Sequence, residues 1–380
     1  MATIIGKVLR VLPLKEVRPR PKAEQTAAER TATERTATER TAEQVSGGET
    51  KNGGKTKKIV DLIISDEFDY RKVSFWEEYA ELVARGKIKT GDVLKIENAW
   101  ILSSEKQAAE KRANVGRFTR VTKISREIDA LSRADYLRQN LTVLAVARPE
   151  KRGRVCVAGV TENGEWVRPQ DVYEADTQNF KNLCVSKVYL DAWRGRRARK
   201  EDRFFVCGEG VSRELSEDEK RAFLEQNLDD SVDAVFKSGK QGERRSLGLI
   251  KPRILRVHEE VAKSGKRGKA EGREKEGRGK SGKGKKERVK SHEQYLRFNF
   301  KDGSGRTYRG WSCRCDDFYK AWNDLKQKHR WTYGWRMLWR LRRSETYLAI
   351  GLTFSDYGVE RLEYGAYPMI VGVHSIKNQK

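Results

Sequence analysis

Long apolar runs are missing from this 380-residue sequence, and none approaches the ~20 consecutive apolar residues that a membrane helix requires. The start, MATIIGKVLR, lacks the charged-then-apolar organisation of a secretory signal peptide. Cysteine is also sparse. The five cysteines are an odd number and are widely spread, which fits a reducing compartment better than a disulfide framework. These absences predict a soluble, cytoplasmic protein.

Side chains that usually carry chemistry are equally scarce. None of the four histidines lies at metal-ligand spacing, and the pair Cys313 and Cys315 alone cannot close a zinc site. Five residues separate Gly48 from Gly54-Lys55, whereas a P-loop has four between its glycines. No Gly-x-Ser-x-Gly elbow is present, and acidic pairs are interpreted as helix caps. We therefore expect no metal, no cofactor and no catalysis.

Charge is what the chain has in excess. Lysine and arginine number 80 against 55 acidic residues, which gives a net charge of +25 and favours a polyanionic partner over a merely solvated surface. Two stretches lack any apolar period and are predicted to be disordered. Residues 16–55 contain the pentad repeat TAAER-TATER-TATER-TAEQ, and residues 263–290 hold thirteen Lys or Arg against four Glu. The basic stretch would add a salt-sensitive attraction to phosphate.

The first 125 residues carry the signals of five strands and one helix. The expected strands are residues 4–12, 59–64, 71–75, 93–100 and 116–125. A helical apolar face over residues 76–85, ended by Gly86, falls between the third and fourth strands. This β-β-β-α-β-β order is that of the five-stranded oligonucleotide-binding (OB) barrel. Phe75 and Trp76 are interpreted as packing residues.

This region resembles the OB domains of replication protein A type single-stranded DNA-binding proteins, especially archaeal ones. The resemblance rests on VSFW at 73–76, GDVLKIENAW at 91–100 and residues 118–124. It covers the first third of the chain and implies binding of single-stranded DNA.

A connecting helix is expected over residues 126–140, with Ile128, Leu131 and Leu137 on one side. Beyond it, residues 141–380 alternate short strands with turns, and helices are expected at 216–227 and 316–329. Further strands are expected at 186–190, 202–207, 249–258, 295–300, 347–354 and 369–374.

This second part resembles a prokaryotic dual-OB domain. The resemblance is carried by residues 143–148, 153–159, 347–352 and 367–373, and most specifically by GEWVRP at 164–169. It implies two further barrels. The fold class predicted for the whole chain is therefore mainly β, with multiple OB-fold barrels, short helices and two disordered inserts.

Proteins that bind single strands need aromatic rings for stacking and cations along the backbone path. In the first barrel the candidate contacts are Phe68, Tyr70, Arg71, Lys72, Trp100, Arg117, Phe118 and Arg120. In the second part they are Arg152, Arg154, Arg168, Trp193, Arg194, Arg196 and Arg197. The segment 331–343 adds four more aromatic residues among arginines. Because arginine both stacks and forks onto phosphate, we expect residues 141–380 to hold most of the affinity.

The function predicted from these features is non-catalytic binding of single-stranded DNA in replication or repair, alongside replication or repair proteins. Two alternatives stay open. OB barrels also bind RNA, so a translation-linked RNA-binding protein fits the same residues. The chain could instead be an adaptor subunit of a defence or repair complex whose enzyme is another chain.

Overall fold

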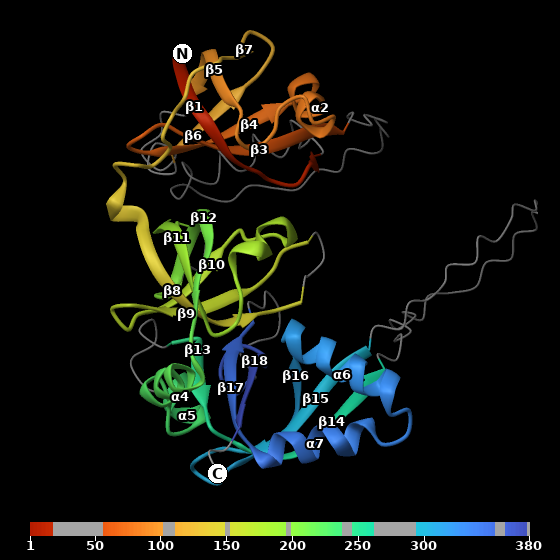
Figure 1. The fold of residues 1–380 in the computed structure, drawn as a ribbon. Coiled ribbons are helices and arrows are strands. Elements are labelled where there is room, and N and C mark those ends of the chain that lie inside the picture. Colours follow the sequence, from red (N-terminus) through yellow and green to blue (C-terminus); the bar gives the residue numbers. More distant parts are fainter. Residues whose placement is uncertain are drawn as a thin grey trace, which may run out of the picture. The chain divides into compact units, whose positions relative to one another are not determined.

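The computed structural model describes residues 1–17, 56–101, 111–148, 153–194, 199–237, 245–261, 294–353 and 362–377. The pentad repeat, the basic stretch 263–290 and three candidate contacts, Arg152, Arg196 and Arg197, lie outside these ranges. The chain divides into two compact units, Met1–Arg138 and Gln139–Lys380 (Figure 1).

The first unit is a closed barrel. Its main strands are β1 (Ala2–Val11), β3 (Lys57–Ser65), β4 (Tyr70–Trp76), β5 (Val93–Ile101) and β6 (Arg112–Val115), with β2 (Lys15–Val17) and β7 (Arg120–Lys123) added at β3 and β5. The ring runs β1-β3-β4-β6-β5 and closes from β5 back to β1. The third and fifth strands, β4 and β6, pair in parallel. This strand order confirms the predicted OB barrel. The fifth strand was placed wrongly, however: it is β6 at 112–115, and the predicted range 116–125 holds only the short edge strand β7.

Two features shape this barrel locally. Helix α2 (Glu78–Ala84) lies between β4 and β5 and buries Ala80 and Val83 in the core, as its apolar spacing predicts. Strand β1 pairs with both β3 and β5, and Gly6 stands where β1 meets both neighbours. A Cβ at Gly6 would lie 2.8 Å from the carbonyl oxygen of Ser65, so only glycine permits this approach.

The predicted connecting helix over residues 126–140 is wrong. Only a 3-10 turn, η1 (Asp135–Leu137), forms before strand β8 begins at Arg138. The backbone N–H of Leu131 donates to the carbonyl of Asp66, and that of Arg133 donates to the carbonyl of Glu67. These residues therefore fold back on the β3–β4 turn, and their N–H groups are used in tertiary contacts instead of helical ones.

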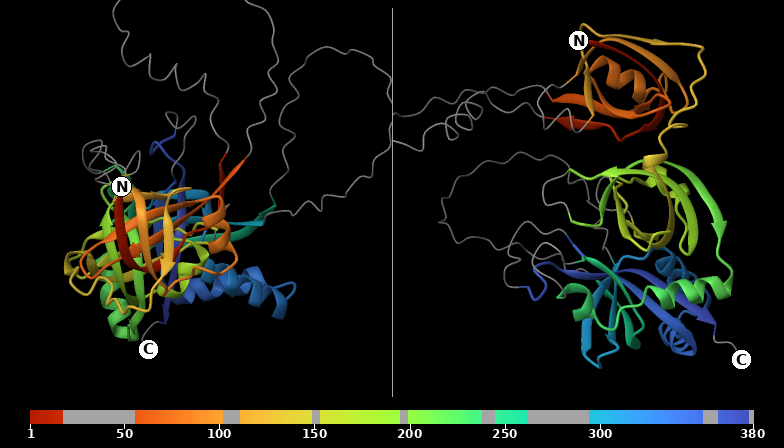
Figure 2. Two further views of the ribbon diagram at one scale, coloured as in Figure 1. Left: turned by 90° about the horizontal axis from the view of Figure 1, so that it is seen from above. Right: turned by 90° about the vertical axis from the view of Figure 1, so that its left-hand side faces the viewer.

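The second unit has two halves, and the first of them repeats the strand order of the first barrel. Its first half is a closed barrel of β8 (Arg138–Val146), β9 (Val157–Thr161), β10 (Trp166–Gln170), β12 (Asp202–Glu214) and β11 (Cys184–Ala192), with η2 (Glu174–Asn179) between the third and fourth strands. Again the third and fifth strands, β10 and β12, run parallel. Figure 2 (right) looks into this barrel along its axis.

The second half is a six-stranded sheet in the order β13-β17-β18-β16-β15-β14. Its strands are β13 (Leu247–Ile250), β14 (Arg253–Val261), β15 (Gln294–Lys301), β16 (Thr307–Cys313), β17 (Ser344–Leu352) and β18 (Pro368–Lys377). The single strand predicted at 249–258 is broken at Lys251-Pro252, where proline removes a ladder N–H. If β13 and β14 count as one bent strand, the order is that of a third OB barrel.

Helices cover this last sheet. Helix α6 (Asp316–Lys328) confirms the helix predicted at 316–329, whereas α7 (Tyr333–Arg343) was not predicted. Helix α4 (Glu217–Gln226) begins at the capping box of Ser216 and Glu219, and α5 (Val232–Phe236) follows it. In the described part of the chain, no helix has the length and apolar character needed to span a membrane.

Candidate nucleic-acid interface

Strand register assembles one outer face on the first barrel. Residues paired across neighbouring strands share a face, and alternate residues point to opposite faces. Val73 and Phe75 of β4 are buried in the core, so Lys72, Ser74 and Trp76 project outward.

Three cross-strand rows follow from the pairing. The first joins Arg10, Ile63, Lys72 and Arg112; the second joins Asp61, Ser74, Asn114 and Trp100; the third joins Lys15, Ile59 and Trp76. We call this surface the outer face. It is centred on β3 and β4, the second and third strands of the barrel, whose face binds the ligand in OB folds.

Trp100 reaches this face because of a local break in β5. Leu94 and Ile96 point inward, but Asn98 has a left-handed φ of 60° and shifts the alternation by one residue. Ala99 then points into the core and Trp100 points out, with 67% of its surface exposed. Trp100 is therefore open to solvent because of a backbone irregularity.

Trp76 corrects a sequence-based interpretation. The sequence predicts a packing residue, yet Trp76 is only half-buried and stands outside the core cluster, on the outer face with Lys72. The signal was available in the sequence: if Phe75 is core, period-two alternation turns Trp76 outward. The same reasoning would have found Arg112 and Asn114.

A buried ion cluster organises the charge of the outer face. Asp61 accepts a hydrogen bond from Ser74 Oγ at 2.7 Å, and its Oδ2 lies 3.0 Å from Lys15 Nζ and 3.5 Å from Lys72 Nζ. Burial raises the pKa of Asp61, but the two lysines and Ser74 outweigh it and hold that pKa below its usual value. Lys72 is only 12% exposed and is engaged here.

Other predicted residues of the first barrel lie at the two ends of β4. Phe68 is exposed in the β3–β4 turn, with the Arg133 guanidinium 5.1 Å from its ring centroid. Phe118, which is 81% exposed, stands with Arg117 in the β6–β7 turn, at the α2 end. Arg120 is exposed at the start of β7. None of these residues belongs to the cross-strand rows that contain Trp76 and Trp100.

Two further candidates are not placed as expected. The Tyr70 ring is only 7% exposed, and Lys111 Nζ lies 4.8 Å from its centroid. Arg71 alternates in step with Val73 and Phe75, so its side chain is directed to the inner side of β4 at the end of the barrel. It therefore does not belong to the outer face. Tyr70 is therefore a packing residue, and its burial excludes it as a stacking surface in this conformation.

In the second unit the equivalent face of the closed barrel is covered. Along β9, Val157 enters the core of its own barrel, whereas Ala158 and Val160 pack against Tyr347 and Val371 of the six-stranded sheet. Both halves thus share one apolar cluster, and the surface formed by β9 and β10 is buried between them. A nucleic acid cannot reach this surface without separating the two halves.

Arg168, predicted as a phosphate contact, lies inside this covered surface. Its Nε donates to Asp202 Oδ1 at 2.7 Å, and its Nη1 donates to Ser246 Oγ at 3.1 Å. Glu201, also buried, accepts from the backbone N–H of Ser246 at 2.9 Å. Both partners of the ion pair are almost fully buried. Arg168 therefore holds the second unit together and is not available to phosphate.

The basic cluster after β11 is partly engaged as well. Arg199 donates to the carbonyl oxygens of Leu352 and Thr353, at 2.9 and 2.8 Å. Burial, with Arg168 nearby, lowers the pKa of Arg199 to about 10. Trp193 is half-buried and its ring lies parallel to that of Phe204, 6.3 Å between centroids. Arg194 is exposed, and Arg154 pairs with Asp171 at 2.8 Å.

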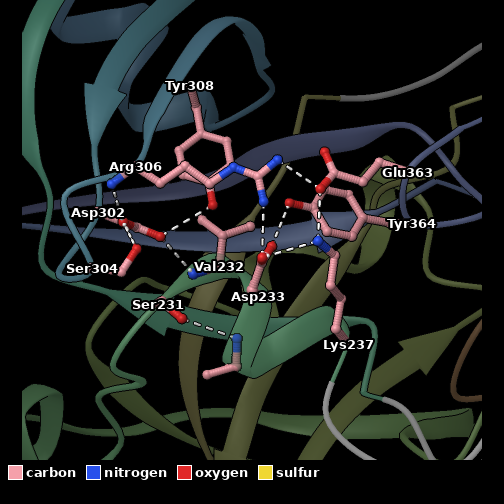
Figure 3. Close-up of polar contacts among 11 residues, drawn as sticks. Ser231, Val232, Asp233, Lys237, Asp302, Ser304, Arg306, Tyr308, Glu363 and Tyr364 are labelled. Atoms are coloured by element: carbon pink, nitrogen blue, oxygen red, sulfur yellow. Dashed lines mark hydrogen bonds and ion pairs between the residues drawn. The ribbon is translucent and has the colours of Figure 1, made fainter.

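A second group of ionisable side chains surrounds the start of α5 (Figure 3). Arg306 donates to Asp233 at 2.8 Å and to Glu363 at 2.7 Å, and Lys237 donates to the same two carboxylates at 3.0 and 2.7 Å. Tyr364 also donates to Asp233, at 2.8 Å, and burial followed by this contact raises the pKa of Tyr364. Cations and carboxylates are thus matched, and the phenol stays protonated.

Asp302 completes this network. It accepts from the backbone N–H of Val232 at 3.1 Å, which caps α5, and from the Tyr308 hydroxyl at 3.1 Å. Burial raises the pKa of Tyr308 as well. The network ties α5 to the β15–β16 turn and to residues 363–364, so we interpret it as structural.

The two neighbouring free cysteines are structural too. Cys313 and Cys315 are both buried in the core of the six-stranded sheet, and burial raises the pKa of each thiol. Among the described residues, no group of three or more His, Cys, Asp or Glu side chains is arranged to hold a metal ion.

No family model matches the sequence. Over 79 residues the chain is 35% identical to the single-stranded DNA binding protein Ssb of Saccharolobus solfataricus. The matched stretch covers 21% of this chain and 47% of that protein. The chain resembles OB-fold single-stranded DNA-binding proteins. It spans about half the length of this curated relative, so the likeness concerns a part of each protein.

Two solved structures are also similar to this chain. One is a replication protein A heterotrimer bound to ssDNA, with a TM-score of 0.27 and 10% identity, covering 99% of this chain and 93% of that chain. The other is a murine DNA binding protein bound with ds DNA, with a TM-score of 0.26 and 12% identity, covering 57% and 98%. At these scores neither likeness carries an argument.

Proposed function

We propose that this protein binds single-stranded DNA, without catalysis, through the outer face of its first barrel. The observation that carries the proposal is the cross-strand arrangement that places Trp76 and Trp100 on one surface with Lys15, Lys72 and Arg112. Proteins that bind single strands of any sequence need aromatic rings on which bases stack and cations that contact the phosphates.

The charge of the outer face supports a polyanionic ligand. Asp61 is its buried carboxylate, and Lys15 and Lys72 already neutralise it. Arg112 then adds an exposed cation beside Lys72. The three rows cross β4 from Lys72 to Trp76, four residue steps of about 3.3 Å each, or roughly 13 Å. That length suits a few nucleotides, toward the low end of the roughly 4–16 that one OB fold covers.

The covered face of the second unit directs the proposal to the first barrel. In the second unit the residues equivalent in strand order, such as Ala158 and Val160, are apolar and packed against a sheet. The curated relative, Ssb, is a single-stranded DNA binding protein, which supports the same ligand. A role in replication or repair, and a cytoplasmic site of action, extend this proposal.

The test is a titration of the full chain with a labelled oligo-dT of about 16 nucleotides. Trp100→Ala should weaken binding by about 1–3 kcal/mol, the typical cost of losing one stacked base. Thermal unfolding should change little, because Trp100 is mostly exposed. Competition with an oligo-U of equal length and with duplex DNA separates DNA, RNA and double-strand binding.

Phe118→Ala is the matched comparison, since it removes another exposed aromatic ring from the same barrel but outside the outer face. We expect a smaller loss from it than from Trp100→Ala. The opposite order would move the site to the β6–β7 turn and leave the function intact. Absence of any binding by the wild-type chain would refute the function itself.

A further inference from the structure

Helix α7 (Tyr333–Arg343) is amphipathic in an unusual way. Met337 and Leu341 are buried in the core of the six-stranded sheet, and Tyr333 and Leu338 are partly buried beside them. This spacing of three and four residues defines the inward stripe that holds the helix to the sheet. The opposite side of the helix presents large aromatic rings to solvent.

Three exposed tryptophans, spaced four residues apart, lie on α7 or just before it. Trp331, just before the helix, is 90% exposed, Trp335 is 66% exposed and Trp339 is 48% exposed. The rings of Trp335 and Trp339 are nearly parallel, at 24°, with centroids 6.4 Å apart. The Arg343 guanidinium lies 4.2 Å from the centroid of Trp339 and extends the stack. Exposed rings of this size, clustered on one helix, indicate a contact surface.

The charged residues of α7 itself all have one sign. Arg336, Arg340 and Arg343 are exposed, and α7 contains no acidic residue. A helix surface that is merely solvated usually mixes Glu with Lys or Arg in i,i+4 pairs. Arginines near the C-terminus also offset the helix dipole, and Arg342 has this structural role because it donates to the carbonyls of Ile254 and Leu255. Arg336 lies in the first half of α7, away from the carbonyl end.

A basic groove begins where α7 ends. Its volume is about 850 Å³, and its charged lining comprises Arg221, Lys251, Arg253, Arg342 and the carboxylate of Glu345. Four cations against one carboxylate make the net charge of the lining positive. Glu345 pairs with Arg221 at 3.0 Å and with Lys251 at 3.5 Å, and Lys251 also pairs with Glu225 at 2.9 Å. Leu341 and Arg342 of α7 line this groove, so a surface that attracts phosphate adjoins the C-terminal end of the helix.

We propose that the exposed side of α7 (Trp331, Trp335, Trp339 and Arg343, with Arg336 and Arg340) is a second contact surface for single-stranded DNA. Bases would stack on the tryptophan faces, and phosphates would follow the arginines toward the groove. This inference rests on the proposed function, and adds to it a site on the second unit. An acidic protein segment would use the arginines but would not require three rings in line.

The experiment uses the full chain carrying Trp335→Ala and Trp339→Ala together. With an oligo-dT of about 40 nucleotides, long enough for two contact surfaces, affinity should fall about tenfold or more. With an oligo-dT of about 8 nucleotides, the wild type should bind two per chain and the variant one. Restoring rings with Trp335→Phe and Trp339→Phe should recover part of the affinity, because stacking tolerates a change of ring.

Tyr367→Ala is the control, because it removes another exposed aromatic of the second unit outside α7. Its affinity and stoichiometry should match the wild type, and thermal unfolding should report a folded chain in every variant. If the wild type binds no single strands, the proposed function fails. If it binds and the double alanine variant binds equally well, the α7 surface alone is refuted. Loss of binding to anionic vesicles, with DNA binding unchanged, would instead assign α7 to a membrane surface.

Discussion

Acidification should destabilise the second unit through His374. This residue of β18 is 4% exposed, and its Nε2 lies 2.8 Å from the carbonyl oxygen of Leu144 on β8. Gly372 permits the approach, since a Cβ there would collide with the same carbonyl. The contact joins the closed barrel to the six-stranded sheet. Burial lowers the pKa of His374 to about 4, although the Leu144 carbonyl and Asp317 act in the opposite direction.

The sign of the effect follows from proton linkage. The unfolded pKa is 6.5, so between pH 6.5 and about 4 the unfolded chain binds more protons at this position than the folded chain. The free energy of unfolding therefore falls as the pH drops through that window. A difference of 2.5 units, at about 1.36 kcal/mol each, corresponds to about 3 kcal/mol from this side chain.

The assay is urea unfolding of the full chain at about pH 7.5 and about pH 4, for the wild type and His374→Gln. Glutamine can still donate to the Leu144 carbonyl but does not titrate. Carboxylates such as Asp61 also lose stabilising pairs in acid, and comparison with the variant removes their contribution. The wild type should lose more stability than the variant between the two pH values. Equal losses would refute the reasoning.

Two further predictions concern stability. Arg168→Ala should cost about 3–5 kcal/mol in urea unfolding, because it leaves the Asp202 carboxylate buried without its cation; unchanged stability with weaker DNA binding would reinstate Arg168 as a contact. Phe75→Ala should cost about 3–5 kcal/mol because the ring is fully buried in the first barrel. Trp76→Ala should cost clearly less and should weaken DNA binding. A melting temperature lowered equally by both would return Trp76 to the core.

Local patterns were sufficient for the secondary structure of the barrels. Apolar alternation and β-branched residues predicted β3 and β5, and the capping box at Ser216 predicted α4. Each of these signals acts between residues a few positions apart, so it can be found by inspection of one segment. The strand order then follows from the OB pattern.

The errors have a common cause in contacts between distant residues. Residues 126–140 have helical apolar spacing, but their N–H groups bond to the β3–β4 turn. Helix α7 was missed because its exposed side is as aromatic as its buried side, so that no simple apolar stripe marks it. Trp76 is more exposed than expected because strand register turns it outward. Tyr70 is more buried than expected because Lys111 covers its ring.

The sequence by itself determined the charge excess, the mainly β fold class and the alternation of inward and outward residues along each strand. Only the tertiary structure decided which outward residues meet solvent. On β4 the outward row ends at Trp76, which is half-exposed, whereas on β10 the outward Arg168 is sealed beneath the neighbouring sheet. The alternation of side chains depends on backbone geometry within one strand. Whether an outward side chain is covered depends on the packing of segments about two hundred residues away in the sequence.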